Sequence, residues 1–218
     1  MSQRPQPAQE NKMGTMPIPK LLLTMSGPMM ISMFIQALYN VVDSMFVSYI
    51  SEAALTAVSL AYPMQNLMIA VATGTGVGVN ALLSRNLGEK NYSMANRVAG
   101  NAIFLGLVSY VVFALLGLLG SRFYFSVQVE DPNIIALGHD YLSIVTVLSI
   151  GCFGQVLLSR LLQSTGKTFY SMVIQMVGAG LNLVLDPIMI FGLLGFPKMG
   201  VAGAALATVI SQLAGTAL

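Results

Sequence analysis

The sequence predicts an all-α integral membrane protein: six transmembrane helices that form one lobe, with a cytoplasmic N-terminus. The first observation is composition. Hydrophobic residues make up 56% of the chain and charged residues only 8%, whereas soluble domains carry about 25% charged residues. The second is the length of the apolar runs, which reach the roughly 20 residues that a helix needs to cross a bilayer and exceed the roughly 10 of a barrel strand. The third is the uneven placement of lysine and arginine.

The elements follow in chain order. Residues 1–19 are polar and are expected to form a disordered cytosolic tail. The apolar stretch that follows is too long for a signal-peptide core and has no small-residue cleavage site after it, so it is expected to remain as the first span. Residues 20–218 then form the transmembrane lobe. Its six expected spans are 21–50, 53–83, 97–119, 134–159, 168–194 and 200–218.

The connections differ in character. The longest, 121–135, contains adjacent aromatic residues and is expected to lie at the membrane interface. The most polar, 84–100, is either a solvated loop that sets topology or a gating element. Inside the second span, ATGTGVGVN at 72–80 lacks the lysine of a phosphate-binding loop and indicates close packing or a flexible helix. Likewise, GVAGAALAT at 200–208 should let the sixth span approach its neighbours.

Basic residues fix the expected orientation. With the N-terminus in the cytoplasm, the outer side holds only Arg122 and Lys198. The inner side holds the other basic residues: Arg4, Lys12, Lys20, Arg85, Lys90, Arg97, Arg160 and Lys167. This is the bias of the positive-inside rule. The sixth span reaches Leu218 without a polar flank, so we expect a chain cut within or just after that helix; a natural six-span protein is the alternative.

Two acidic residues, Asp43 and Asp186, lie well inside spans. A charge at the bilayer centre costs about 2.5–3.5 kcal/mol on insertion scales, and such residues usually face the bundle interior and mark ion or substrate paths. Asp43 lies eight residues before Ser51, near which the first span is expected to end, and Asp186 lies eight residues before Leu194. Thr208 lies eight residues into the sixth span. All three are therefore expected roughly 12 Å below the outer surface.

Neighbouring residues strengthen the prediction of a site. Tyr39 and Asn182 each precede one of the acids by four residues and so share its helix face. Pro187 should kink the fifth span and free backbone oxygen beside the acid, and Pro28 should kink the first span. Oxygen ligands of this kind suit a hard cation such as Na⁺, or a proton.

Other interpretations remain. Each aspartate could simply hydrogen-bond to a neighbouring helix. An intramembrane aspartyl protease is disfavoured because its YD and GxGD signatures are replaced here by YNVVD and VLDP, so no enzyme is expected. Cys152 and His139 are the single cysteine and histidine, which disfavours zinc. The net charge of +2 is too small to suggest nucleic acid. No cofactor is expected beyond a coupling ion, H⁺ or Na⁺.

Several motifs in order carry a family resemblance: YNVVD, SRNLGEKNYSMANRVAG, and NLVLDPIMIFG followed by P-x-x-GVAGAALATVISQ. From about residue 17 onward the chain resembles the N-terminal half of prokaryotic multidrug and toxic compound extrusion (MATE) transporters. The resemblance implies cation-coupled efflux of lipophilic or cationic drugs by alternating access, across the plasma membrane of a bacterium or archaeon. It also implies a second six-helix lobe that faces this one across a central cavity.

The resemblance also assigns site residues. Asp43 matches the first-helix acid of the family's cation site, and Tyr39 matches a tyrosine near it. Asn182 and Asp186 match the fifth-helix pair, and Thr208 matches the sixth-helix hydroxyl. The family's roughly twelve spans exceed the six found here, so the second lobe is expected to be a C-terminal half or a second copy in parallel orientation.

Two rival functions stand beside drug efflux. A lipid-linked oligosaccharide flippase of the wider superfamily often places basic residues in its cavity for pyrophosphate. No lysine or arginine is expected deep in a span here, which disfavours it. The other rival is an inactive lobe or a non-transporting membrane subunit, which would retain the helices without moving any solute.

Overall fold

The computed structural model describes residues 16–218, and within that range it contains seven α-helices, one short 3-10 turn and no strand. The predicted all-α fold is confirmed. The predicted N-terminal tail falls almost wholly outside the described residues. The helices are α2 (Ile18–Ser48), α3 (Glu52–Gly88), α4 (Tyr92–Gln128), α5 (Pro132–Val147), α6 (Ile150–Ser164), α7 (Thr168–Phe191) and α8 (Val201–Ala217), with the turn η1 at Leu193–Gly195.

Four helices, α2, α3, α4 and α7, are long and apolar enough to cross a membrane. The pair α5 and α6 passes the same test together and counts as a fifth span, although it is bent. The sixth expected span corresponds to α8, an apolar helix of 17 residues. Every predicted span therefore coincides with a helix or a helix pair, and the chain is a multi-pass membrane protein by these features.

The prediction for 121–135 was wrong in part. Instead of ending at residue 119, α4 continues to Gln128 and takes in most of the expected interfacial connection. Phe125 is fully buried, and the Tyr124 hydroxyl donates to the Leu60 carbonyl of α3 at 3.0 Å. These contacts hold the extra turns against the lobe. The chain turns only where Asp131 caps α5 and Pro132 occupies its first turn.

The span expected at 134–159 is also broken, because α5 and α6 meet at a 45° bend between Val147 and Ile150. One local cause is the Thr146 hydroxyl, which donates back to the Leu142 carbonyl at 2.6 Å, a bond that bends helices. Across the break, Thr216 of α8 donates to the Gly151 carbonyl at 3.0 Å. The bend is thus stabilised by a contact from a helix distant in sequence.

The end of α6 lies further along the chain than expected. Gly166 adopts a φ of 80°, and the N–H groups of Gly166 and Lys167 bond back to the carbonyls of Gln163 and Leu162. This pattern is a Schellman motif, which closes the helix after Ser164. Arg160 therefore lies inside α6, four residues before its last residue, and not just after the expected span.

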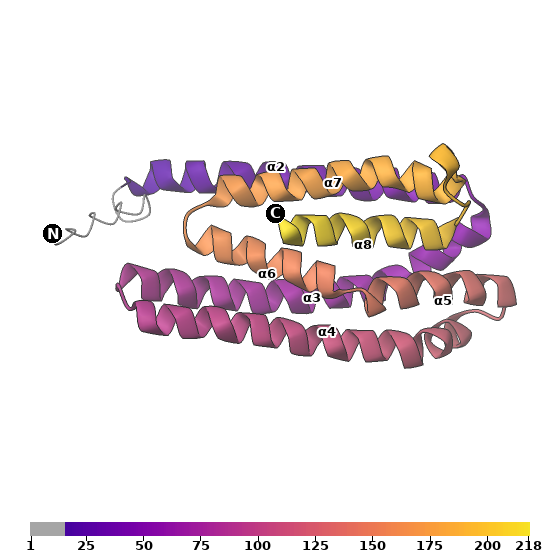
Figure 1. Ribbon diagram of the computed structural model, residues 1–218, viewed down its shortest axis with the longest axis horizontal. Coiled ribbons are helices and arrows are strands. Elements are labelled where there is room, and N and C mark those ends of the chain that lie inside the picture. Colours follow the sequence, from indigo (N-terminus) through magenta and orange to yellow (C-terminus); the bar gives the residue numbers. More distant parts are fainter. Residues whose placement is uncertain (1–15) are drawn as a thin grey trace.

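The helices run along one long axis (Figure 1). The first turn of α2, the α3–α4 connection and the α6–α7 connection lie at the same end. This end, which we call the basic end, carries Lys20, Arg85, Lys90, Arg97 and Lys167. Arg122 and Lys198 belong to the other end, which we call the opposite end. Within the described residues, the charge asymmetry read from the sequence is therefore a property of the two ends of the bundle.

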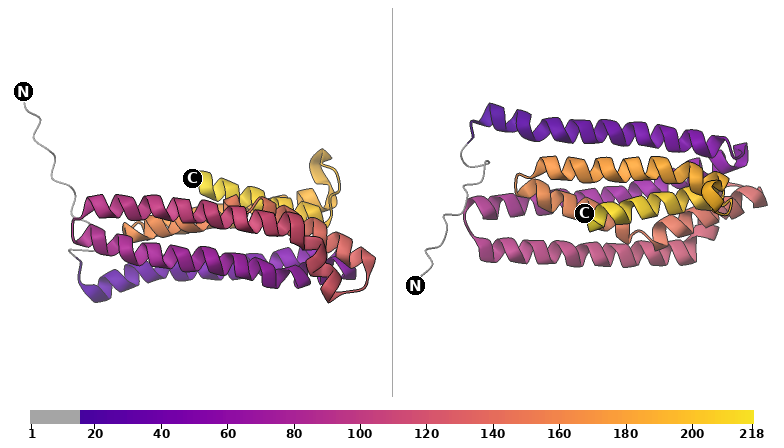
Figure 2. Two further views of the ribbon diagram at one scale, coloured as in Figure 1. Left: turned by 90° about the horizontal axis from the view of Figure 1, so that it is seen from below. Right: turned by 45° about the horizontal axis from the view of Figure 1, so that its top comes forward.

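Near the middle of the bundle lies α8, packed against α7, α6 and α5 (Figure 1). Small residues on α8 allow it to pack closely against these helices. A methyl group on Gly203 would come within 2.5 Å of the Met189 carbonyl oxygen of α7. The predicted close approach of 200–208 is confirmed at this contact. By contrast, α2 lies at the edge of the bundle, where it packs mainly on α7 (Figure 2).

Candidate functional site

A polar cluster lies where α2, α7 and α8 meet, and Asn182 is at its centre. Its side-chain amide is assigned from its neighbours: the nitrogen donates to Asp186 Oδ2 at 2.8 Å, and the oxygen accepts from the Thr208 N–H at 3.1 Å. The same end of the amide lies 3.4 Å from the Thr208 hydroxyl. Asn182 is 1% exposed and Asp186 is fully buried. The four-residue spacing on α7 therefore fixes one oxygen of the buried acid.

The second acid approaches from α2. Asp43 lies within electrostatic range of Asp186, and α2 packs against α7. The Oδ1 atom of Asp43 is buried and has no hydrogen-bond partner. Two neighbouring carboxyl groups can hydrogen-bond to each other only if one of them is protonated, because two carboxylates are both acceptors. The arrangement can therefore hold a proton, or a cation in its place.

The hydroxyl groups of Tyr39 and Thr208 complete the set, with their oxygens 3.5 Å apart. The structure thus brings together all five residues predicted from the sequence, from three helices. Their common depth of roughly 12 Å below the outer surface stays a prediction.

Sequence reasoning missed Tyr141 and Gln65. The Tyr141 side chain is buried and lies within electrostatic range of both acids, and its hydroxyl accepts a hydrogen bond from Gln65 at 3.1 Å. These residues extend the polar cluster to α5 and α3. Tyr141 lies about as far from the expected outer end of its span, residue 134, as Asp43 does from residue 51. The same depth argument therefore applies to it.

The two prolines predicted to kink helices lie inside continuous helices. Pro187 directly follows Asp186 in α7, and Pro28 lies in the first half of α2, where its carbonyl accepts from the Ser32 hydroxyl at 2.9 Å. Proline has no N–H to donate, so each residue leaves one carbonyl of its helix without the usual bond. The size of any bend stays a prediction.

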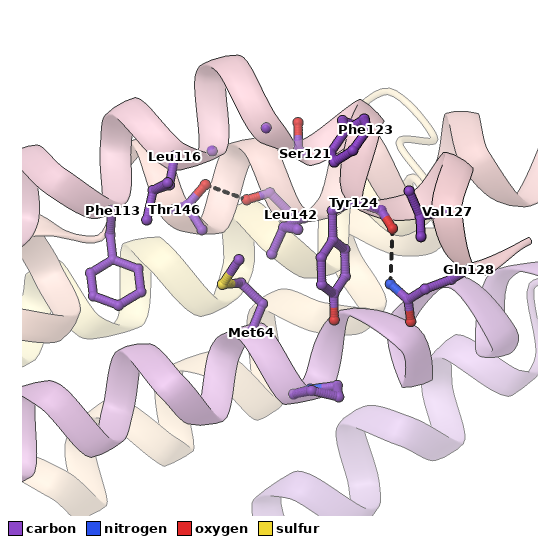
Figure 3. Close-up of a pocket in the computed structure, with 13 residues that line it drawn as sticks. Met64, Phe113, Leu116, Ser121, Phe123, Tyr124, Val127, Gln128, Leu142 and Thr146 are labelled. Carbon is purple, nitrogen blue, oxygen red and sulfur yellow. Dashed lines mark hydrogen bonds between the residues drawn. The ribbon is translucent and has the colours of Figure 1, made fainter.

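A separate cavity of about 510 Å³ lies between α3, α4 and α5. Figure 3 shows Met64, Phe113 and Leu142 among the side chains that line it, with Tyr124 and Gln128 toward one side. Pro63 of α3 and Gly117 and Gly120 of α4 also line it. None of the five predicted site residues lines it, and it has no charged wall.

The MatE family model matches residues 28–188. The chain belongs to the MatE family. Its resemblance to MATE transporters is thereby confirmed, and with it the class of a membrane transporter family rather than a family of enzymes.

Individual members of the MatE family show how much of a transporter the chain covers. A FAD transporter of Shewanella oneidensis is 32% identical over 212 residues, which are 93% of this chain and 45% of that protein. The multidrug export protein MepA of Staphylococcus aureus is 28% identical over 199 residues, 91% of this chain and 43% of that protein. The chain spans less than half the length of each.

A solved structure gives the same picture. The outward-facing conformation of a multidrug resistance MATE family transporter superposes with a TM-score of 0.85 at 30% identity. The match covers 91% of this chain and 43% of that one. The fold is therefore that of one MATE lobe.

Proposed function

We propose that the chain is one lobe of a cation-coupled exporter of lipophilic and cationic organic molecules, which works by alternating access in the plasma membrane of a bacterium or archaeon. The observation that carries the proposal is the pair of neighbouring buried acids inside the lobe: Asp186, held by Asn182, and Asp43, whose buried Oδ1 has no hydrogen-bond partner. Family membership supports the transport class, and the length of the relatives supports a second lobe as partner.

The acid pair favours H⁺ as the coupling ion. A proton between the two acids satisfies both at once, and Asn182 already occupies one oxygen of Asp186. Sodium would need more oxygen ligands, and the Asn182 amide oxygen is engaged by the Thr208 N–H. Sodium coupling is therefore the second arm of the test.

Loss of the proton supplies a driving force for movement. Two adjacent carboxylates in a low-dielectric interior repel each other strongly. The helix that can respond is α2, because it lies at the edge of the bundle and makes few contacts beyond α7. Its displacement would change the face that the lobe presents to the second lobe, and hence the shape of the cavity between them.

The substrate has two candidates. The similarity to MepA favours lipophilic drugs, and the similarity to a FAD transporter favours a flavin nucleotide. The second is favoured specifically by the higher identity, 32% against 28%. The two candidates differ in charge, so they place different demands on the lobe.

The test is coupled transport in vesicles that hold the purified chain, with a second copy in parallel orientation as the second lobe. A pH gradient or a Na⁺ gradient is imposed, and transport is read with a lipophilic cationic dye. We expect dye movement driven by the pH gradient, and loss of that movement in Asp43→Asn and Asp186→Asn. Asp140→Asn is the matched control, because Asp140 is an exposed acid of α5 outside the cluster.

Three outcomes would contradict the proposal or part of it. Absence of dye movement with the unchanged chain supports the inactive-lobe rival. Normal movement in Asp43→Asn removes the acid pair from the mechanism. Movement that follows Na⁺ alone replaces the proton by sodium.

A further inference from the structure

A cation lies inside the lobe, away from the acid pair. Arg160 is half-buried on α6, and its side-chain stem passes α3 at Gly76, where an added methyl group would come within 2.8 Å of Cγ. Gly76 lies 12 residues before the end of α3 at Gly88, or about 18 Å along that helix. The guanidinium group therefore belongs to the lobe interior near the basic end and not to a surface loop.

The arginine is held by a chain of buried groups. Its Nη1 atom donates to Gln163 Oε1 at 2.9 Å, and Gln163 Nε2 donates to the Ser171 hydroxyl of α7 at 3.0 Å. Gln163 is 6% exposed and Ser171 is 1% exposed. Because Ser171 engages the amide nitrogen, the amide oxygen is the end that faces Arg160. The guanidinium is thus oriented through Gln163 by two helices.

Within residues 16–218, no acidic side chain pairs with Arg160, and the ion pair that is present joins Arg85 to Glu89 at the surface. A half-buried charge without a counter-charge is costly. A neutral donor would make the same bond to Gln163 without that cost. An arginine that only set topology would lie in the interface and would need neither Gly76 nor a buried glutamine. The charge itself therefore points to an anionic partner.

The chemistry of the guanidinium group indicates which class of anion would bind it. A guanidinium has five N–H donors in a planar fork, and one bond to Gln163 leaves most of them unused. A planar fork matches the oxygens of phosphate. We propose that Arg160, oriented by Gln163 and Ser171, is a phosphate-binding point near the basic end of the lobe. The phosphate belongs either to a phosphorylated solute or to a phospholipid headgroup. This inference does not depend on cation coupling by the acid pair.

The experiment measures equilibrium binding to the purified full chain in a phosphate-free maltoside detergent, without any gradient. The soluble arm compares FMN with riboflavin, which share a ring system and differ by one phosphate group, using flavin fluorescence. The lipid arm compares phosphatidylglycerol with diacylglycerol, using native mass spectrometry. We expect at least one pair to show a preference of about tenfold or more for the phosphate-bearing member, the range of a charge-assisted bond. The pair that shows it identifies the source of the phosphate.

Variants assign the preference to Arg160. Arg160→Gln should abolish it and leave riboflavin or diacylglycerol binding unchanged, whereas Arg160→Lys should retain part of it. Ser171→Ala should weaken the preference severalfold, because Gln163 is then no longer held in place. If Arg160→Gln does not fold, Ser171→Ala and Arg160→Lys together test whether Arg160 causes the preference. Lys20→Gln, which removes a basic-end cation outside the lobe interior, is the matched control.

The proposal is overturned if the unchanged chain distinguishes neither pair, or if Arg160→Gln keeps the full preference. Since no transport is measured, failure of cation coupling would not affect either result.

Discussion

At the scale of single residues, the cluster is organised by one amide group. Asn182 presents a donor to Asp186 and an acceptor to the Thr208 backbone, so its two ends define where a carboxylate and a helix N–H must lie. An aliphatic residue there would leave a fully buried carboxyl oxygen without a donor, at a cost of about 1–3 kcal/mol. The amide therefore couples the position of α8 to the orientation of the acid on α7.

The Thr208 hydroxyl can be tested separately from its backbone. Replacing Thr208 by valine keeps a similar shape but removes the group that faces Tyr39 at 3.5 Å and the Asn182 amide at 3.4 Å. We expect Thr208→Val to lower the free energy of unfolding by about 1 kcal/mol and to weaken coupled transport. Thr208→Ser, which keeps the hydroxyl, should stay close to the unchanged chain in thermal unfolding and dye assays. Equal behaviour of the two variants would show that the hydroxyl has no role.

At the scale of helices, long apolar runs predict well where a transmembrane helix is present, because a run of about 20 apolar residues has few other stable states in a bilayer. Boundaries depend on contacts that no local pattern contains. The extra turns of α4 follow from the burial of Phe125 against the lobe, and the break after α5 is supported by Thr216 from the other end of the sequence. Both errors in the expected spans thus have tertiary causes.

The close approach of α8 to α7 gives a test at this scale. The methyl group of Gly203→Ala would meet the Met189 carbonyl oxygen at 2.5 Å and its carbon at 2.7 Å, and these are backbone atoms that cannot rotate away. We expect a loss of about 1–3 kcal/mol in stability, as for other overpacked cores. Thermal unfolding of the purified chain in detergent measures it.

Gly180→Ala provides the matched control, because Gly180 lies in α7 with nothing within 4 Å of the added methyl group. In a helix, alanine is favoured over glycine by about 1 kcal/mol, so this variant should be neutral or slightly stabilised. If the two variants unfold at the same temperature, the α7–α8 contact is looser than the structure indicates.

At the scale of the whole molecule, counting residues along the helices predicted which polar side chains lie together in the lobe. Asp43, Asp186 and Thr208 were placed at one level by counting residues from helix ends, and the structure joins them through Asn182 and Tyr39. The count rests on the constant rise of a helix per residue, and the depth below the outer surface stays a prediction. It could not indicate which helices are neighbours. Tyr141 and Arg160 were therefore missed, since their significance depends on contacts with α3, α7 and the acid pair.

The charge asymmetry between the two ends predicts an orientation that labelling can check. Lys167 and Lys198 are both exposed, and they lie in the α6–α7 connection at the basic end and in the α7–α8 connection at the opposite end. The positive-inside rule places the basic end in the cytoplasm.

Cys152 is buried and is the single cysteine, so replacing it by alanine gives a background without reactive thiols. Lys167→Cys and Lys198→Cys then make the same change on the two sides. In intact cells, a membrane-impermeant maleimide should label Lys198→Cys at once and Lys167→Cys only after permeabilisation. The reverse pattern would invert the lobe, and would place the acid pair nearer the cytoplasm than the outer surface from which the proposed coupling ion enters.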